Sequence, residues 1–166
     1  MKVLVPLDGS SAALAAVRHL ESLARAHIPV QAVLLHVQVR FHRHIAELTS
    51  RAARDAIRAE RSARALSPAV DRLSRAKIPV LAMTARGAPG ERIAAVAERD
   101  RVDEIVMGAG RHPRWLRWIN PSLAQEVMQR TDIPVTVLAR GRVGRVERYA
   151  VPAGIVGLAA LLLTAD

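Results

Sequence analysis

The sequence predicts an α/β protein: a five-stranded, doubly wound parallel sheet followed by an apolar C-terminal tail. Five short apolar runs lack the polar alternation of half-exposed strands, as expected for parallel strands covered on both faces. Amphipathic segments of helical length separate these runs, and this alternation favours a parallel sheet with right-handed crossovers. A recurring Ile-Pro pair marks three helix-to-strand junctions, because proline ends a helix and keeps the preceding residue extended.

The five predicted strands follow from the apolar runs. Two of them, "KVLVPL" and "DEIVMG", begin without an Ile-Pro pair. The other three lie in segments that contain the pair, "AHIPVQAVLLHV", "AKIPVLAMTARG" and "TDIPVTVLARG". In chain order the five segments occupy residues 2–7, 26–37, 76–87, 103–108 and 131–141.

Four helices are predicted between the strands, each with apolar residues at helical spacing. They span about residues 10–26, 41–75, 89–99 and 122–131. Pro68 lies inside the second of these helices and is expected to break or kink it. The resulting order, βαβαβαβαβ, predicts one domain over residues 1–140.

Composition narrows the classes of function. The chain has no cysteine, which excludes disulfides, thiolate metal sites and cysteine nucleophiles. It opens without a secretory signal pattern, so we expect a cytoplasmic protein. The formal net charge is +10, but Lys2 and Lys77 are the only lysines, and the arginines are spread over helical faces and loops. That distribution is typical of an arginine-rich composition rather than of a binding patch, so nucleic acid is not an expected partner.

The carboxyl ends of the strands are the expected place for a ligand, because a doubly wound sheet opens its crevice there. The residues at this edge are Asp8 to Ser10, His36 to Gln38, and Gly108 onward. Asp8 is expected either to bind a ligand or metal or to cap the helix that follows. His36, at the end of a strand, is expected to be a core or rim histidine rather than a catalyst.

Five motifs occur in a fixed order along the chain: "VLVPLDGS", "VLLHV", "RGAPGERI", "DEIVMGAG" and "PSLAQEVMQRTDIPVTVL". Over about residues 2–139 the chain thereby resembles the universal stress protein family. The resemblance implies an adenine nucleotide alpha hydrolase-like fold, a homodimer, and a regulatory role in stress without a common enzymatic reaction. Many members of that family bind ATP through a G-x-x-G-(x)9-G-(S/T) loop after the fourth strand, whereas others lack the motif and do not bind ATP.

The same resemblance implies a tentative nucleotide site. It places Asp8 beside the adenosine and the Val37 backbone at the base. In the loop, Gly108 matches the first glycine and Ser122 matches the hydroxyl residue. The tentative nucleotide-binding residues are Asp8, Val37, Gly108, Gly110, Arg111 and Ser122.

Two of the three loop glycines are replaced. A phosphate loop uses glycine because its backbone adopts positive φ and brings N–H donors close to oxygens without a Cβ. Arg111 stands at the second glycine position and Pro121, which has no N–H, at the third. The sequence therefore favours degraded or absent ATP binding, and it also predicts a helix that begins at Pro121. The alternative is an ATP-binding member in which Arg111, Arg114 and Arg117 contact phosphate through their guanidinium groups.

No catalytic or metal site is predicted. His42, His44 and Glu47 are close in sequence, but no further His or Cys nearby completes a metal site. Neither a G-x-S-x-G elbow nor a G-x-x-x-x-G-K-[ST] loop occurs, so no enzyme class is indicated. Trp115 and Trp118 are three residues apart and are expected to pack beneath a helical turn rather than to stack on bases.

Residues 141–166 are predicted to be a basic linker followed by an apolar C-terminal segment. Residues 150–165 carry no charge, and a helix of that length would span about 24 Å, less than the roughly 30 Å of a bilayer core. Three alternatives stay open for this tail. It docks on its own domain or on a dimer partner, or it stays disordered. The remaining alternative is that it sits in or across a membrane, with the arginines at 140, 142, 145 and 148 on the cytoplasmic side, which would make the protein a membrane-associated interaction module.

Overall fold

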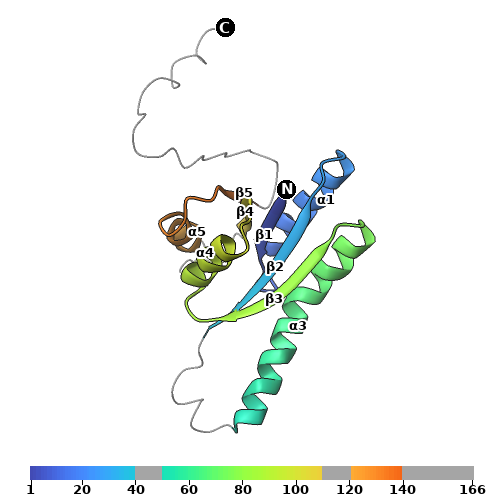
Figure 1. Cartoon of the computed structure of the whole chain (residues 1–166). Helices are drawn as coiled ribbons and strands as arrows, with labels where there is room; N and C mark the ends of the chain where they lie inside the picture. Colours follow the sequence, from blue (N-terminus) through green and yellow to red (C-terminus); the bar gives the residue numbers. More distant parts are fainter. Residues whose placement is uncertain (40–49, 110–120, 140–166) are drawn as a thin grey trace.

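Five parallel strands form one sheet in the order β3-β2-β1-β4-β5 (Figure 1). The computed structural model describes residues 1–39, 50–109 and 121–139. The strands are β1 (Lys2–Pro6), β2 (Gln31–Gln38), β3 (Val80–Arg86), β4 (Glu104–Ala109) and β5 (Val135–Ala139). The helices are α1 (Ala13–Arg25), α3 (Arg51–Arg75), α4 (Pro89–Arg99) and α5 (Pro121–Met128).

The strand order confirms the doubly wound fold predicted from the sequence. From the central strand β1 the chain runs outward through β2 to β3, and then returns to the other side of β1 for β4 and β5. The direction of winding therefore reverses between β1 and β4, which is where a sheet of this kind opens its ligand crevice.

Helices cover both faces of the sheet. On one face α1 and α3 pack on the sheet through residues such as Val17, Leu20 and Leu73, all of which are fully buried. On the other face α4 and α5 bury Ile93 and Val127. This two-sided coverage explains why the strands read as continuous apolar runs rather than as alternating ones.

Helix α3 differs from the prediction at its start and at Pro68. It begins at Arg51, because Ser50 has an extended backbone and its Oγ accepts a hydrogen bond from Ala53 N at 3.2 Å. Residues 40–49 lie outside the described part of the chain. The break expected at Pro68 was wrong, since the helix continues through it to Arg75. Pro68 is exposed, and burial of Ala69 and Leu73 on the opposite face supports the helix beyond it.

Helices α1 and α3 are joined by an ion pair. The Arg72 guanidinium donates from Nε and Nη2 to the two carboxylate oxygens of Glu21, at 2.9 and 2.7 Å. These hydrogen bonds, with the positive charges of Arg72 and of arginines on α1, hold the pKa of Glu21 below its ordinary value. The pair fixes α3 beside α1, and thus positions the N-terminal half of α3 over the carboxyl ends of β1 and β2.

Candidate functional site

A tight turn after β1 forms one wall of the candidate site. Gly9 has a φ of 81°, a conformation that glycine adopts without steric cost. Asp8 Oδ1 accepts a hydrogen bond from Ser10 N at 2.8 Å, and Ser10 Oγ accepts one from Ala13 N at 3.2 Å. Asp8 therefore caps the turn, and Ser10 satisfies the Ala13 N–H donor. Helix α1 begins at Ala13, three residues later than expected.

A pocket of about 350 Å³ opens beside this turn. Its walls come from Asp8 and Gly9, from the end of β2 at residues 36–39, and from the side of α3. The α3 side is lined by Arg58, Arg61, Arg64 and Ala65. The volume lies within the range of small-molecule sites, and the position is at the carboxyl edge of the sheet.

His36 is fixed on the pocket wall by a backbone carbonyl. Its Nδ1 lies 2.7 Å from Leu7 O. A carbonyl oxygen only accepts, so Nδ1 carries the proton and donates; in the neutral ring Nε2 is then an acceptor. His36 is half-buried and lines the pocket, which agrees with the expected rim histidine.

Gln38 attaches α3 to the end of β2. Its Nε2 donates to Ser62 Oγ at 2.6 Å and to the carbonyl oxygen of Arg58 at 3.1 Å. Ser62 is buried, so the hydroxyl depends on this partner rather than on water. The two hydrogen bonds set the distance between β2 and α3, and with it the width of the pocket.

The arginines on α3 are functional candidates that the sequence analysis did not single out. Arg58 Nη1 contacts Asp55 Oδ1 at 2.9 Å, and Arg64 Nη2 contacts Glu60 Oε1 at 2.7 Å. The sequence signal was present, because arginines recur along this helix at spacings of three and four. It was not decisive, since a solvated helix face has the same pattern.

A model of the universal stress protein family matches residues 1–139. The chain belongs to the universal stress protein family. Among curated proteins, none matches this sequence significantly. The family assignment agrees with the resemblance inferred from the five motifs.

Solved structures of similar fold extend over most of this universal stress protein. The hypothetical protein MJ0577, a test case of structural genomics, is 25% identical with a TM-score of 0.69, and the match covers 86% of this chain and 97% of that one. A universal stress protein family protein from Burkholderia pseudomallei is 24% identical with a TM-score of 0.63, covering 82% and 94%. One from Arabidopsis thaliana with AMP bound is 21% identical with a TM-score of 0.60, covering 85% and 92%.

The sequence-predicted site residues of this universal stress protein fall in four groups. Asp8 and Val37 come from different strands and line the same pocket. Gly108 does not line it. Gly110 and Arg111 lie outside the described residues, as do Trp115, Trp118, His42, His44 and Glu47. Ser122 is the second residue of α5, which begins at Pro121 as predicted.

Gly108 has a structural reason to be glycine. A Cβ at this position would overlap the carbonyl group of Ala12 and would lie 2.9 Å from Ala13 Cα. The start of α1 therefore packs directly on β4 at this point, which only a residue without a side chain permits. The match of Gly108 to the first glycine of the family's loop is explained by this contact without a ligand.

Within residues 1–39, 50–109 and 121–139, no group of three or more His, Cys, Asp or Glu side chains is placed to hold a metal ion. In the same ranges, no helix has both the length and the apolar character that crossing a membrane requires.

Proposed function

We propose that this universal stress protein is a regulatory protein of the stress response, not an enzyme, and that it binds the adenosine part of an adenine nucleotide in the pocket between Asp8 and Val37. The observation that carries this proposal is the meeting of these two residues, from β1 and β2, in one open pocket of about 350 Å³. They are the residues that the family resemblance assigns to the adenosine.

The chemistry of the pocket is consistent with a nucleoside. Asp8 supplies a carboxylate that accepts hydrogen bonds from ribose hydroxyls, and His36 supplies an acceptor at Nε2 when its ring is neutral. Val37 and Val39 supply apolar surface for a base. Solved members of the family with AMP, cAMP and dAMP bound support this ligand class.

We further propose that ATP binding through the loop after β4 is degraded. Arg111 places a side chain, and Pro121 removes an N–H, at two positions where the family's motif has glycine. Gly108, the glycine that is retained, is accounted for by its contact with α1. Contacts with this loop would then make the affinity for ATP little higher than the affinity for adenosine.

Calorimetric titration of the purified protein with adenosine, AMP and ATP, each with Mg²⁺, tests the proposal. Adenosine is expected to bind, and Asp8→Ala to weaken adenosine binding about tenfold, the loss of a hydrogen bond to a charged group. Asp71→Ala, an exposed carboxylate in the C-terminal half of α3, is the matched control. Absence of heat with all three ligands, together with no shift in melting temperature, contradicts nucleotide binding.

We propose a cytoplasmic homodimer as the working form. The family resemblance implies the dimer, and β3 and β5 are the edges of the described sheet, where unpaired backbone groups are available to another chain. Sedimentation equilibrium of the full chain tests it; a monomer across micromolar concentrations contradicts it.

A further inference from the structure

Two side chains on one face of β2, His36 and Gln38, line the pocket with their hydrogen-bond donors already in use. Alternate residues of a strand point to the same side, and Gln38 reaches Ser62 on α3, so both side chains lie on the α3 side of the sheet. They flank Val37, which supplies surface for the base in the proposed nucleoside site. The polar atoms that these two side chains leave to a ligand therefore decide which groups the base must offer.

The second ring nitrogen of His36 is a hydrogen-bond acceptor. Nδ1 lies 2.7 Å from the carbonyl oxygen of Leu7, and a carbonyl oxygen only accepts, so the proton of the neutral ring is on Nδ1. Nε2 then carries a lone pair and no proton. Among residues 1–39, 50–109 and 121–139, the Leu7 carbonyl is the only hydrogen-bond partner of this ring. A ligand group that donates a hydrogen bond would satisfy Nε2.

The amide of Gln38 also leaves an acceptor. Its nitrogen donates to the Arg58 carbonyl oxygen at 3.1 Å and to Ser62 Oγ at 2.6 Å, which uses both amide hydrogens. The Arg58 carbonyl fixes this orientation, because the amide oxygen could not pair with another acceptor. In the part of the chain that the structure describes, no donor is paired with Oε1. The β2 wall of the pocket thus offers two acceptors, Nε2 of His36 and Oε1 of Gln38.

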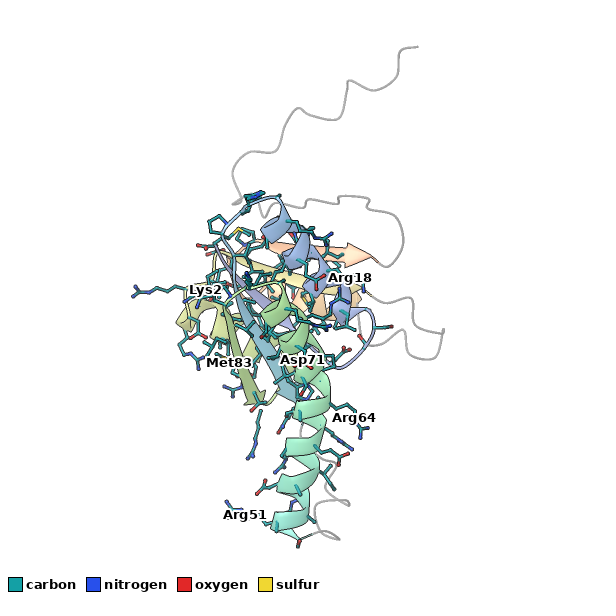
Figure 2. The ribbon with its side chains drawn as sticks, turned by 90° about the vertical axis from the view of Figure 1, so that its right-hand side faces the viewer. Lys2, Arg18, Arg51, Arg64, Asp71 and Met83 are labelled. Atoms are coloured by element: carbon teal, nitrogen blue, oxygen red, sulfur yellow. The ribbon has the colours of Figure 1, made fainter. Side chains whose placement is uncertain are left out.

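The α3 wall of the pocket has the opposite hydrogen-bonding character. It is formed by the middle of α3, where Figure 2 shows Arg64 between Asp71 and Arg51, which is at the far end of the helix. Guanidinium groups donate hydrogen bonds and do not accept them. The two walls therefore orient a ligand, with its donor groups toward β2 and its acceptor groups toward α3 or solvent.

We propose that His36, together with Gln38, makes this pocket selective for a base with an amino group, such as adenine, over a base with a carbonyl oxygen in the same place, such as hypoxanthine. This inference rests on the proposed nucleoside site and names the group of the base that the site recognises. The amino group of adenine has two hydrogens, which Nε2 of His36 and Oε1 of Gln38 accept. The carbonyl oxygen of hypoxanthine would instead face two acceptors, and polar groups left unpaired in a binding site cost affinity.

The test is calorimetric titration of the full chain with adenosine, inosine and purine riboside, which has a hydrogen in place of the amino group. The titrations are made at about pH 8, where histidine side chains are neutral. Adenosine is expected to bind at least about tenfold more tightly than either of the other two nucleosides. Equal affinities for the three, or a preference for inosine, would show that the amino group is not recognised.

His36→Asn separates recognition from a structural role of this side chain. The asparagine amide nitrogen takes the place of Nδ1 and still donates to Leu7, whereas the acceptor at Nε2 is removed. The variant is expected to lose about tenfold in affinity for adenosine and to bind inosine and purine riboside as before. His19→Asn, the same change at a half-buried histidine on α1, is the control and should keep the preference for adenosine.

Nitrogen-15 NMR of the histidine rings tests the assignment without an affinity. A proton on Nδ1 of His36 and none on Nε2, with a shift of the Nε2 resonance when adenosine is added, supports the proposal. A proton on Nε2 overturns it. This measurement also decides the question if the melting temperature shows that His36→Asn does not fold.

The outcomes distinguish failure of this inference from failure of the proposed function. If the three nucleosides bind equally, or if His36→Asn lowers the affinity for all three alike, the selectivity is wrong and the nucleoside site stands. If none of the three binds, the nucleoside site and the selectivity both fail.

Discussion

Gln38 donates a hydrogen bond to the buried hydroxyl of Ser62, with 2.6 Å between Nε2 and Oγ, and this contact joins the end of β2 to the middle of α3. The same nitrogen bonds the Arg58 carbonyl oxygen. One side chain thereby holds together the two elements that form opposite walls of the pocket. Its loss should affect both stability and ligand binding.

Gln38→Leu is expected to destabilise the fold by about 1–3 kcal/mol, since it leaves the buried Ser62 hydroxyl without its partner. For a chain of this size that corresponds to a fall in melting temperature of roughly 2–4 °C per kcal/mol. Urea unfolding and thermal melts measure the effect. Ser67→Ala, an exposed hydroxyl on the same helix, is the control and should change the melting temperature by less than about 1 °C. An unchanged melting temperature for Gln38→Leu would show that Ser62 finds another partner.

Gly108→Ala and Gly9→Ala are expected to lower the free energy of unfolding by different amounts, because the two positions require glycine for different reasons. At Gly108 a methyl group would overlap the Ala12 carbonyl, which should cost about 3 kcal/mol or more. At Gly9 the nearest atom to an added Cβ is Ala65 Cα at 3.6 Å, so only the positive φ is costly, by about 1–2 kcal/mol. Urea unfolding measures both. Equal costs would contradict the close packing of α1 on β4.

We expect the Glu21–Arg72 ion pair to make the free energy of unfolding depend on pH in the acid range. The hydrogen bonds from Arg72 lower the pKa of Glu21 in the folded state, so the pair stabilises the fold above the ordinary pKa of 4.5. That stabilisation is lost as the pH falls below 4.5 through the lowered folded-state value. Because Arg72 is 36% exposed, we expect no more than about 1 kcal/mol.

The measurement is unfolding free energy against pH for the natural chain and for Glu21→Gln. The difference between the two chains should be largest near pH 7 and should shrink below pH 4.5. Glu98→Gln, an exposed carboxylate on α4, is the control. If the difference in unfolding free energy between the two chains stays constant down to strongly acid pH, ionisation of Glu21 does not stabilise the fold.

The sequence predicts a domain that ends near Arg140, so we expect a chain truncated after this residue to keep its fold. The family match ends at residue 139, and the two apolar cores are formed by residues before it. Circular dichroism and thermal melts of the truncated chain measure this.

Flotation of both chains on anionic vesicles tests the role of residues 150–165. Binding of vesicles by the full chain alone supports membrane contact. A lower melting temperature of the truncated chain supports docking of these residues on the domain.

The strands and their succession along the chain could be predicted because local chemistry determines them. Proline after isoleucine marks where strands start, and continuous apolar runs identify strands covered on both faces. The same local chemistry placed Asp8 and Val37 at the carboxyl edge, where the structure brings them into one pocket.

The role of the α3 arginines could not be predicted in this way. Arg58 and Arg61 line the pocket because α3 packs on the sheet through Ala69 and Leu73 and is joined to β2 by Gln38. Those contacts join residues far apart in the chain. The start of α3 was missed for a simpler reason: a hydroxyl residue caps a helix only if its own backbone is non-helical, as it is at Ser50. The sequence around residues 41–50 does not reveal that.

The junction between β1 and β4 also has a consequence for the order of folding. Val3 is paired with Glu104 and Leu4 with Ile105 there, and Asp103 N donates to Lys2 O at 2.8 Å. Lys2 N in turn donates to the Asp103 carboxylate, with 2.6 Å between N and Oδ2. These contacts close a loop of about a hundred residues, whereas β1 with β2 and β2 with β3 close much shorter ones. Loop-closure entropy therefore delays the β1–β4 junction, and β1, β2 and β3 with α1 and α3 are expected to assemble first. The pocket, built entirely from that early half, would exist before the second half of the sheet docks.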